Sequence, residues 1–190
     1  MASTGRPRDP ALDGRILDAA SAALAEQGVR GVRAQDIAAR AGVPKSTIYR
    51  RWPSLRHLIV EAMARQVDLG ERAPDGDAAL ELRDAARRFG RAVAGPRGRA
   101  LVELAVEVAA DPELAELYRR LLVLPNRAGA LELMRRGQAA GDFREGADLE
   151  LALDGAIGAI FYRVVVLGRE VSAGEVDAIA DELIARLRGA

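Results

Sequence analysis

The stretch Gln35–Leu58, QDIAARAGVPKSTIYRRWPSLRHL, decides how the rest of the chain is interpreted. A short run with apolar residues on one side leads to Gly42, where glycine can take the left-handed conformation that ends a helix. Pro44 suits the first position of a new helix, because its missing N–H is not needed there. The segment Lys45–Arg51 is basic and rich in hydroxyls, and Pro53 ends it. This pattern predicts a helix-turn-helix, whose second helix enters the major groove of DNA.

The composition favours an all-helical protein. About half of the 190 residues are apolar, so a real core can be buried, and the alternation typical of strands is nearly absent. The chain has no cysteine and a single histidine, His57, which together argue against a disulfide framework and a zinc site and suit a reducing cytoplasm. The N-terminus lacks the apolar run of a signal peptide, and the apolar stretch 156–167 is too short to span a bilayer. We therefore expect a cytoplasmic protein with no cofactor, no metal and no membrane contact.

The net charge of zero hides a difference between the two ends of the chain. Residues 1–56 carry ten Lys and Arg against five Asp and Glu, whereas the remainder carries 18 basic and 23 acidic side chains. A basic head on an acidic body is the sign expected of a nucleic-acid-binding end. Residues 1–8, which include Arg6 and Arg8, are predicted to be disordered. They are either a basic arm that reaches phosphate or the minor groove, or a frayed terminus.

The helix-turn-helix is flanked by two longer predicted helices. The first starts at Asp9-Pro10, a cap followed by a proline, and ends at Gly28. The second is capped by Ser54 and runs to about Gly70. Pro, Gly and charged residues make 71–77 the clearest linker. The predicted domains are residues 9–70, which bind DNA, and residues 71–190.

Residues 16–63 resemble the DNA-binding domain of the tetracycline-repressor (TetR) family of transcriptional regulators. The resemblance implies an all-α homodimer with an N-terminal operator-binding domain. It also implies a C-terminal domain that dimerises and usually binds a small-molecule effector, whose binding normally releases the DNA. The matching residues are Gly28, Ile37-Ala38, Ala41-Gly42-Val43, Thr47-Ile48-Tyr49, Trp52-Pro53-Ser54 and Leu58.

Carried over by position, the resemblance implies which residues meet DNA. Lys45, Ser46 and Thr47 lie at the groove-facing start of the recognition helix, where they can reach base edges or backbone. Tyr49 gives its hydroxyl to a phosphate, the alternative being a half-buried packing tyrosine. Ile37, Ile48 and Trp52 belong to a small core. Further candidates for contacts to the DNA backbone are Arg33, Gln35, Arg50, Arg51 and Arg56.

Two positions depart from the family's pattern. Members commonly have Ser or Thr where this chain has Arg33, which cannot cap the second helix but can still reach phosphate. Members commonly carry Lys where this chain has Leu55, with Arg56 next. Because one residue turns a side chain by about 100° around a helix, Arg56 need not replace that lysine. The phosphate contacts, and not the fold, are what these departures put in question.

The second domain is predicted to consist of consecutive helices. Asp111-Pro112 is a helix start, Pro125 kinks or divides the helix that follows, and Gly141 ends it. The predicted helices cover residues 78–93, 99–110, 111–140, 148–167 and 174–188, with a break at 95–98.

Gly155 and Gly158 interrupt the apolar stripe of the predicted helix 148–167. Glycine costs up to about 1 kcal/mol in a helix interior, which suggests that something packs very close. In the family, the last two helices of each subunit form a four-helix dimer interface; alternatively, these glycines face the subunit's own core or a ligand cavity. The predicted interface residues are Leu153, Ala156, Ile160, Val164, Val176, Ala180, Leu183 and Leu187.

No catalytic constellation stands out in the sequence. Glu103 and Glu107 share one helix face, but a charged solvent face explains them better than acid–base chemistry. An effector pocket, mostly apolar with a few polar anchors, is the better use of the second domain. The candidate anchors are Glu107, Tyr118, Asn126, Tyr162 and Arg163.

Together these observations predict a homodimeric, TetR-like regulator, a repressor that binds a near-palindromic double-stranded DNA operator. A small-molecule effector releases it by favouring the conformation that misfits DNA. One alternative is a ligand-binding or enzymatic helical protein that keeps a helix-turn-helix fold with weak or no DNA binding. Another is a protein–protein adaptor whose short basic helix is merely solvated.

Overall fold

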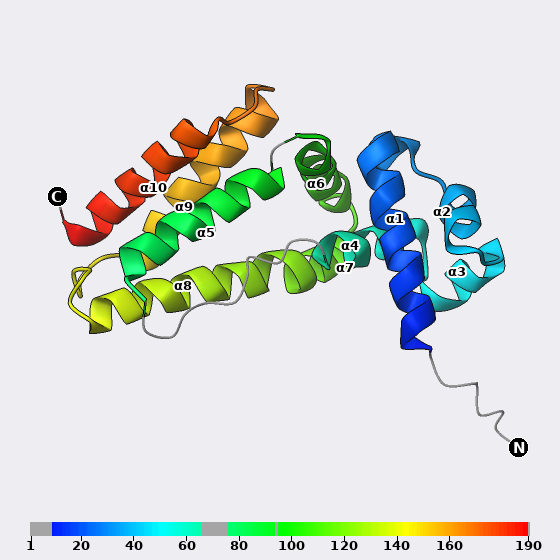
Figure 1. Cartoon of the computed structure of the whole chain (residues 1–190), viewed down its shortest axis with the longest axis horizontal. Coiled ribbons are helices and arrows are strands. Elements are labelled where there is room, and N and C mark those ends of the chain that lie inside the picture. Colours follow the sequence, from blue (N-terminus) through cyan, green and yellow to red (C-terminus); the bar gives the residue numbers. More distant parts are fainter. Residues whose placement is uncertain (1–8, 66–75, 94, 190) are drawn as a thin grey trace, which may run out of the picture.

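The predicted all-α fold is confirmed. The computed structural model describes residues 9–65, 76–93 and 95–189, and within these ranges it contains helices and no strand (Figure 1). The predicted basic arm, residues 1–8, lies outside the described residues. So do residues 66–75, which hold the end of the helix that starts after Ser54 and the predicted domain boundary.

The helices form two groups joined by a middle layer (Figure 1). One end of the molecule holds α1 (Pro10–Gly31), α2 (Ala34–Ala41) and α3 (Lys45–Arg51). The other end holds α5 (Ala78–Val93), α8 (Leu124–Ala139), α9 (Leu149–Phe161) and α10 (Ala173–Arg188). Between them lie α4 (Leu55–Ala64), α6 (Gly95–Val108) and α7 (Pro112–Tyr118).

Local sequence signals explain where α1 begins and bends. The Asp9 carboxylate accepts hydrogen bonds from the N–H groups of Ala11 and Leu12, at 3.0 and 3.3 Å, which caps the helix. Gly28 has φ of +69° and breaks the regular helix at the predicted position. One further turn follows to Gly31, because the Val32 N–H bonds back to the Gly28 carbonyl and closes it. The chain is thus redirected toward α2 just after α1 has buried its apolar face.

Two prolines shape the middle of the C-terminal half. The predicted break at 95–98 is wrong, because α6 already starts at Gly95. The helix tolerates Pro96 because this residue lies in the first turn, where its missing N–H costs no helical bond. Pro125 does divide a helix: a π-helical turn, Arg119–Val123, separates α7 from α8. A widened turn suits this position because proline cannot donate the regular backbone bond.

Close packing joins α10 to α5. Arg83 and Arg87 on α5 pair with Asp181 and Asp177 on α10, the second through two bonds of 2.6 and 3.1 Å. A Cβ on Gly90 would lie 2.6 Å from a methyl group of Val176, so only glycine lets the two helices approach this closely. Ion pairs and close packing therefore hold α5 and α10 together at the C-terminal end.

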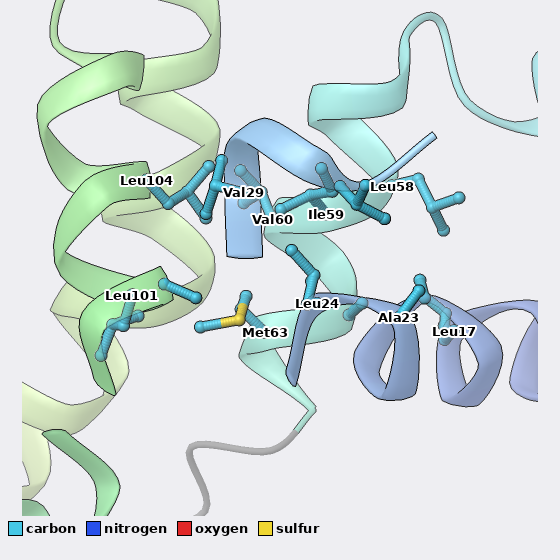
Figure 2. Close-up of a cluster of buried hydrophobic side chains, with 14 of the residues drawn as sticks. Leu17, Ala23, Leu24, Val29, Leu58, Ile59, Val60, Met63, Leu101 and Leu104 are labelled. Atoms are coloured by element: carbon cyan, nitrogen blue, oxygen red, sulfur yellow. The ribbon is translucent and has the colours of Figure 1, made fainter. Parts of the chain in front are cut away.

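Two clusters of buried apolar side chains make up the core. The smaller lies at the far end of the C-terminal half and includes Leu133, Met134 and Leu187. The larger runs without a break from the DNA-binding end into the C-terminal half. Figure 2 shows its central part, where Leu104 of α6 points toward Val29 and toward Val60 of α4. The two halves of the chain therefore share a core, in addition to the covalent connection.

We predict that Leu104→Ala destabilises the whole chain. Leu104 is fully buried in the shared cluster, so its truncation should cost roughly 2–5 kcal/mol of unfolding free energy. Urea denaturation measures this loss. Val106→Ala, on the exposed side of the same helix, is the matched control and should change stability by less than about 0.5 kcal/mol. Equal effects of the two substitutions would contradict the shared core.

Candidate nucleic-acid interface

The turn between α2 and α3 has the geometry that its sequence predicts. Gly42 takes φ of +67° and ψ of +37°, the left-handed conformation. Its N–H bonds to the Ala39 carbonyl at 3.3 Å, and the Val43 N–H bonds to the Ala38 carbonyl at 3.0 Å, which satisfies the free carbonyls at the end of α2. Pro44 is extended and stands just before α3 instead of being its first helical residue, a small correction to the prediction.

A small apolar core fixes the angle between these two short helices. Ile37 and Ile48 are fully buried and Trp52 nearly so, as predicted. The Trp52 indole N–H donates to the Glu61 carboxylate, which ties the end of α3 to α4. The Ser54 hydroxyl accepts a bond from the His57 N–H and caps α4, again as predicted. A seven-residue helix is too short to be stable alone, so α3 depends on these contacts.

The outward side of α3 carries polar and basic side chains. Lys45, Ser46, Tyr49 and Arg50 are exposed, and Tyr49 keeps 45% of its surface accessible. The Lys45 ammonium lies 5.6 Å from the centre of the Tyr49 ring, a cation–π contact between residues one turn apart. Arg33 and Gln35 are also exposed at the start of α2, and Arg33 makes no side-chain cap there.

Two of the predicted contact residues of α3 point inward instead. Thr47 keeps only 7% of its surface accessible, because it lies on the side of α3 that packs with Ile48. Arg51 places a guanidinium nitrogen 2.7 Å from the Asp13 carboxylate of α1, and its side chain is 13% exposed. In this structure Arg51 joins α3 to α1, so its predicted contact with the DNA backbone is not supported by its position.

Comparison with known proteins identifies the two halves of the chain. Residues 16–62 match the model described as bacterial regulatory proteins, tetR family, and residues 74–183 match that of the tetracyclin repressor-like C-terminal domain. The HTH-type regulator YdeS of Bacillus subtilis (strain 168) is 34% identical over 169 residues, which are 88% of this chain and 85% of YdeS. The chain belongs to the TetR family. It is a DNA-binding transcriptional regulator of the helix-turn-helix (HTH) type.

Other TetR-family relatives and structures agree. The HTH-type regulator AqdR of Rhodococcus erythropolis is 29% identical over 158 residues, covering 83% of this chain and 76% of AqdR. The crystal structure of the TetR family regulator SCO0332 is similar over 92% of this chain and 97% of its own, with a TM-score of 0.79 and 28% identity. FadR of Bacillus subtilis, solved in complex with stearoyl-CoA, shares the fold with a TM-score of 0.62 at 19% identity, over 93% and 98% of the two chains.

Arg56 lies at the junction of this TetR-family chain, away from the outer side of α3. Its guanidinium donates to the Val29 carbonyl at 2.9 Å and pairs with the Glu107 carboxylate at 2.9 Å. The predicted DNA contact of Arg56 is not supported by this position. The ion pair also corrects both predictions for Glu107, which is neither a solvent-face charge nor a free effector anchor. Leu55, where family members commonly carry Lys, is half-buried against the larger core cluster.

The remaining effector candidates do not form one site. Tyr118 is half-buried beside the larger cluster, and burial raises the pKa of its hydroxyl. Asn126 donates to the Leu122 carbonyl one turn earlier, at 2.6 Å. Tyr162 and Arg163 lie in the π-helical turn Tyr162–Val166 that follows α9, where Tyr162 is exposed and Arg163 donates to the Ala159 carbonyl at 2.9 Å. Arg163 lines the groove between α9 and α10, whereas Tyr118 and Asn126 do not.

The predicted dimer residues are corrected in a similar way. Most of the predicted apolar stripe packs inside the subunit's own core, because α9 and α10 turn it toward each other and toward α5 and α8. Ala156 and Val164 alone among these eight residues remain partly accessible. Buried in the subunit are Leu153, Ile160, Val176, Ala180, Leu183 and Leu187.

A second stripe, which the predictions missed, is exposed on α9 and on the π-helical turn Tyr162–Val166 that follows it. Leu151, Tyr162 and Val166 each keep more than half of their surface accessible. A groove runs beside it between α9 and α10, with small residues such as Gly155 and Ala159 in its wall together with four charged ones, Arg163, Glu175, Glu182 and Arg186. Gly158, on the same side, would meet no atom within 4 Å if it carried a Cβ. Helical spacing of the large apolar residues 151, 162 and 166 was the signal that could have indicated this face.

The described residues were also compared with the requirements of a metal site and of a membrane span. Across the ranges 9–65, 76–93 and 95–189, the His, Asp and Glu side chains nowhere gather in a group that could hold a metal ion. The helices in the same ranges are also too short or too polar to cross a membrane.

Arg50 and Arg51 are neighbours on α3, and we predict that their substitutions have different effects. Arg51→Met should lower the free energy of unfolding by roughly 1–3 kcal/mol, because it leaves the Asp13 carboxylate unpaired. It should leave the salt dependence of DNA binding unchanged. Arg50→Met should do the opposite and reduce the slope of log K against log salt by about 1, as expected for one lost phosphate contact. Thermal unfolding and salt titrations of DNA binding separate the two, and exchanged effects would contradict the assignment.

Proposed function

We propose that this protein is a homodimeric repressor whose two α3 helices enter successive major grooves of a near-palindromic operator. The observation that carries the proposal is the division of α3 into two sides. Its apolar side holds the HTH core, while Lys45, Ser46, Tyr49 and Arg50 stay exposed together. The amino end of a recognition helix lies nearest the bases. Lys45 and Ser46 therefore read base edges, and Tyr49 and Arg50 bind phosphates.

The start of α2 adds a second point of contact with the DNA backbone. Arg33 and Gln35 are exposed there, and the backbone N–H groups of the first turn carry the partial positive charge of a helix N-terminus. Arg33 replaces the small capping residue that is common in the family, and its longer side chain reaches a phosphate as a charge. Contacts at both α2 and α3 hold the recognition helix in one register on the duplex.

The exposed face of α9 and α10 supports dimerisation through these helices. A two-fold interface presents the same patch from both subunits, and large apolar patches are rare on soluble monomers unless they are covered. Leu151, Tyr162 and Val166 supply the large side chains of such a patch. Gly155 and Ala159, in the groove beside them, let the partner's helices approach closely. This face replaces the interface residues that the sequence alone predicted.

The C-terminal half also suits an effector. FadR of Bacillus subtilis, a fold relative, was solved with stearoyl-CoA, so that this arrangement of helices can carry a ligand. We propose that Tyr118, which packs against the shared core, and Asn126, which is half-buried two turns later in the chain, face the effector of this protein. An effector acts only through its different affinity for the DNA-bound and released conformations. An effector bound next to the shared core would contact the region that connects the two halves, so its affinity can differ between the two conformations.

Lys45 is the only lysine in the sequence, which makes the DNA contact directly testable. Amine-reactive acetylation, followed by peptide mass spectrometry, should modify Lys45 readily in the free protein. Saturation with a duplex from the DNA flanking its own gene should slow that reaction by at least about tenfold, because the ammonium is then buried against DNA. A small free amine added to the same reaction serves as the control for the activity of the reagent. Equal modification of Lys45 with and without a bound duplex would contradict the proposed orientation of α3.

Substitutions give an independent test of the same proposal. Lys45→Ala and Tyr49→Phe should each weaken binding to that duplex by roughly tenfold, the worth of one or two good contacts. Arg135→Ala is the matched control, because it removes one positive charge from the exposed side of α8. Gel shifts at low and moderate salt with unlabelled competitor DNA measure the affinities. If the control weakens binding as much as the two α3 variants do, net charge explains the loss and the proposed contacts are wrong.

A further inference from the structure

One side chain connects three segments of the molecule at the junction of its two halves. The Arg56 guanidinium reaches the Val29 carbonyl with one terminal nitrogen and the Glu107 carboxylate with the other, each at 2.9 Å. Val29 belongs to the turn after the kink of α1, Arg56 is the second residue of α4, and Glu107 lies in the last turn of α6. The contact therefore bridges the DNA-binding end and the C-terminal half.

The chemistry of arginine makes this contact directional. A guanidinium is planar and presents its N–H groups in a fixed fork, so two acceptors bound by its two arms are held at a set angle. Both side chains are largely shielded, with 34% of Arg56 and 26% of Glu107 accessible, which reduces screening by water and salt. Apolar side chains such as Leu104 in the same junction can shift against their neighbours without breaking a directional bond. The Arg56 guanidinium, in contrast, cannot rotate without losing one of its two bonds.

The position of Arg56 in the chain links this contact to the recognition helix. α3 ends at Arg51, and α4 starts at Leu55 after a short, tightly bonded turn. The indole of Trp52 donates to Glu61, and Ser54 caps α4, so side-chain bonds tie the end of α3 to α4. Fixing Arg56 against α6 therefore fixes the direction in which α3 leaves the C-terminal half.

We propose that Arg56 and Glu107 form a positioning pair that sets the angle of the helix-turn-helix and thereby the half-site spacing that the dimer accepts. This inference rests on the proposed dimeric operator binding. The dimer face lies on α9 and α10, far from α3, so a small rotation at the junction is carried over the length of the subunit (Figure 1). Both copies rotate together in a two-fold dimer, which changes the distance between the two α3 helices.

Glu107→Gln is the test variant, because it removes the charge with little change in shape. Glu103→Gln is the matched control: Glu103 lies one turn earlier on the same face of α6, is exposed, and has no ion pair among the described residues. Each protein is titrated with near-palindromic duplexes, selected with the wild type from a random library, whose half-site spacing differs by single base pairs. Amide hydrogen exchange over residues 55–60 and 104–108 is measured in the same proteins without DNA.

The wild type and Glu103→Gln should bind one spacing best and lose affinity steeply on either side. Glu107→Gln should bind the duplex of the best spacing roughly fivefold more weakly, which is the lower end of the usual coupling between two sites of a protein. Its affinities for duplexes of neighbouring spacings should differ less from that value than they do in the wild type. Exchange should be faster over residues 55–60 and 104–108 in Glu107→Gln alone, while Ile48 in α3 stays protected. A merely structural role would lower stability without changing the spacing profile.

The two proposals can fail separately. If the wild type binds no duplex, the proposed function is wrong, and exchange alone then decides whether the pair holds the junction. An unchanged spacing profile with unchanged exchange in Glu107→Gln overturns the positioning pair. Arg56→Lys, which keeps the charge but lacks the fork, should fall between the wild type and Glu107→Gln in the spacing profile. A wild-type profile for Arg56→Lys would overturn the role of the fork.

Discussion

The burial of Leu104 against Val29 and Val60 is the contact on which the rest of the structure depends (Figure 2). It joins α6 to α1 and α4, so that the DNA-binding end and the C-terminal half are parts of one apolar core. The three short helices α2, α3 and α4 could bury little by themselves. A change in the position of α6 must therefore be accommodated by α1 and α4, since a close-packed core transmits shifts instead of absorbing them.

Charged side chains at the edge of this core fix how its helices are oriented relative to one another. Arg51 binds Asp13, Arg56 binds Glu107, and the His57 ring lies 3.8 Å from Glu113 of α7. Each of these pairs connects a residue near the recognition helix to another helix. Apolar burial supplies most of the stabilisation, and directional bonds select one arrangement among those that bury similar area. A regulator needs both, because its two states must each be well defined.

A pattern of residue types predicts which side of a helix is buried, but it does not predict the partner against which that side packs. The stripe of Leu153, Ile160 and Leu183 indicated correctly that one side of each helix is buried, but not what buries it. A subunit's own core and a dimer partner require the same apolar periodicity. Arg50 and Arg51 are adjacent and chemically identical, yet one faces solvent and the other Asp13. Their difference comes from the 100° turn per residue and from the place of α1 beside α3.

The sequence by itself determined the helical fold, the turn at Gly42, the caps at Asp9, Ser54 and Asp111, and the family. These features depend on short-range chemistry: a glycine that can adopt positive φ, a side chain that accepts from the next turn, a proline without an N–H. Only the tertiary structure decided that Arg56 meets Glu107 and that α9 exposes Leu151. Such contacts join residues far apart in the chain, and their geometry follows from how whole helices pack, which no local pattern records.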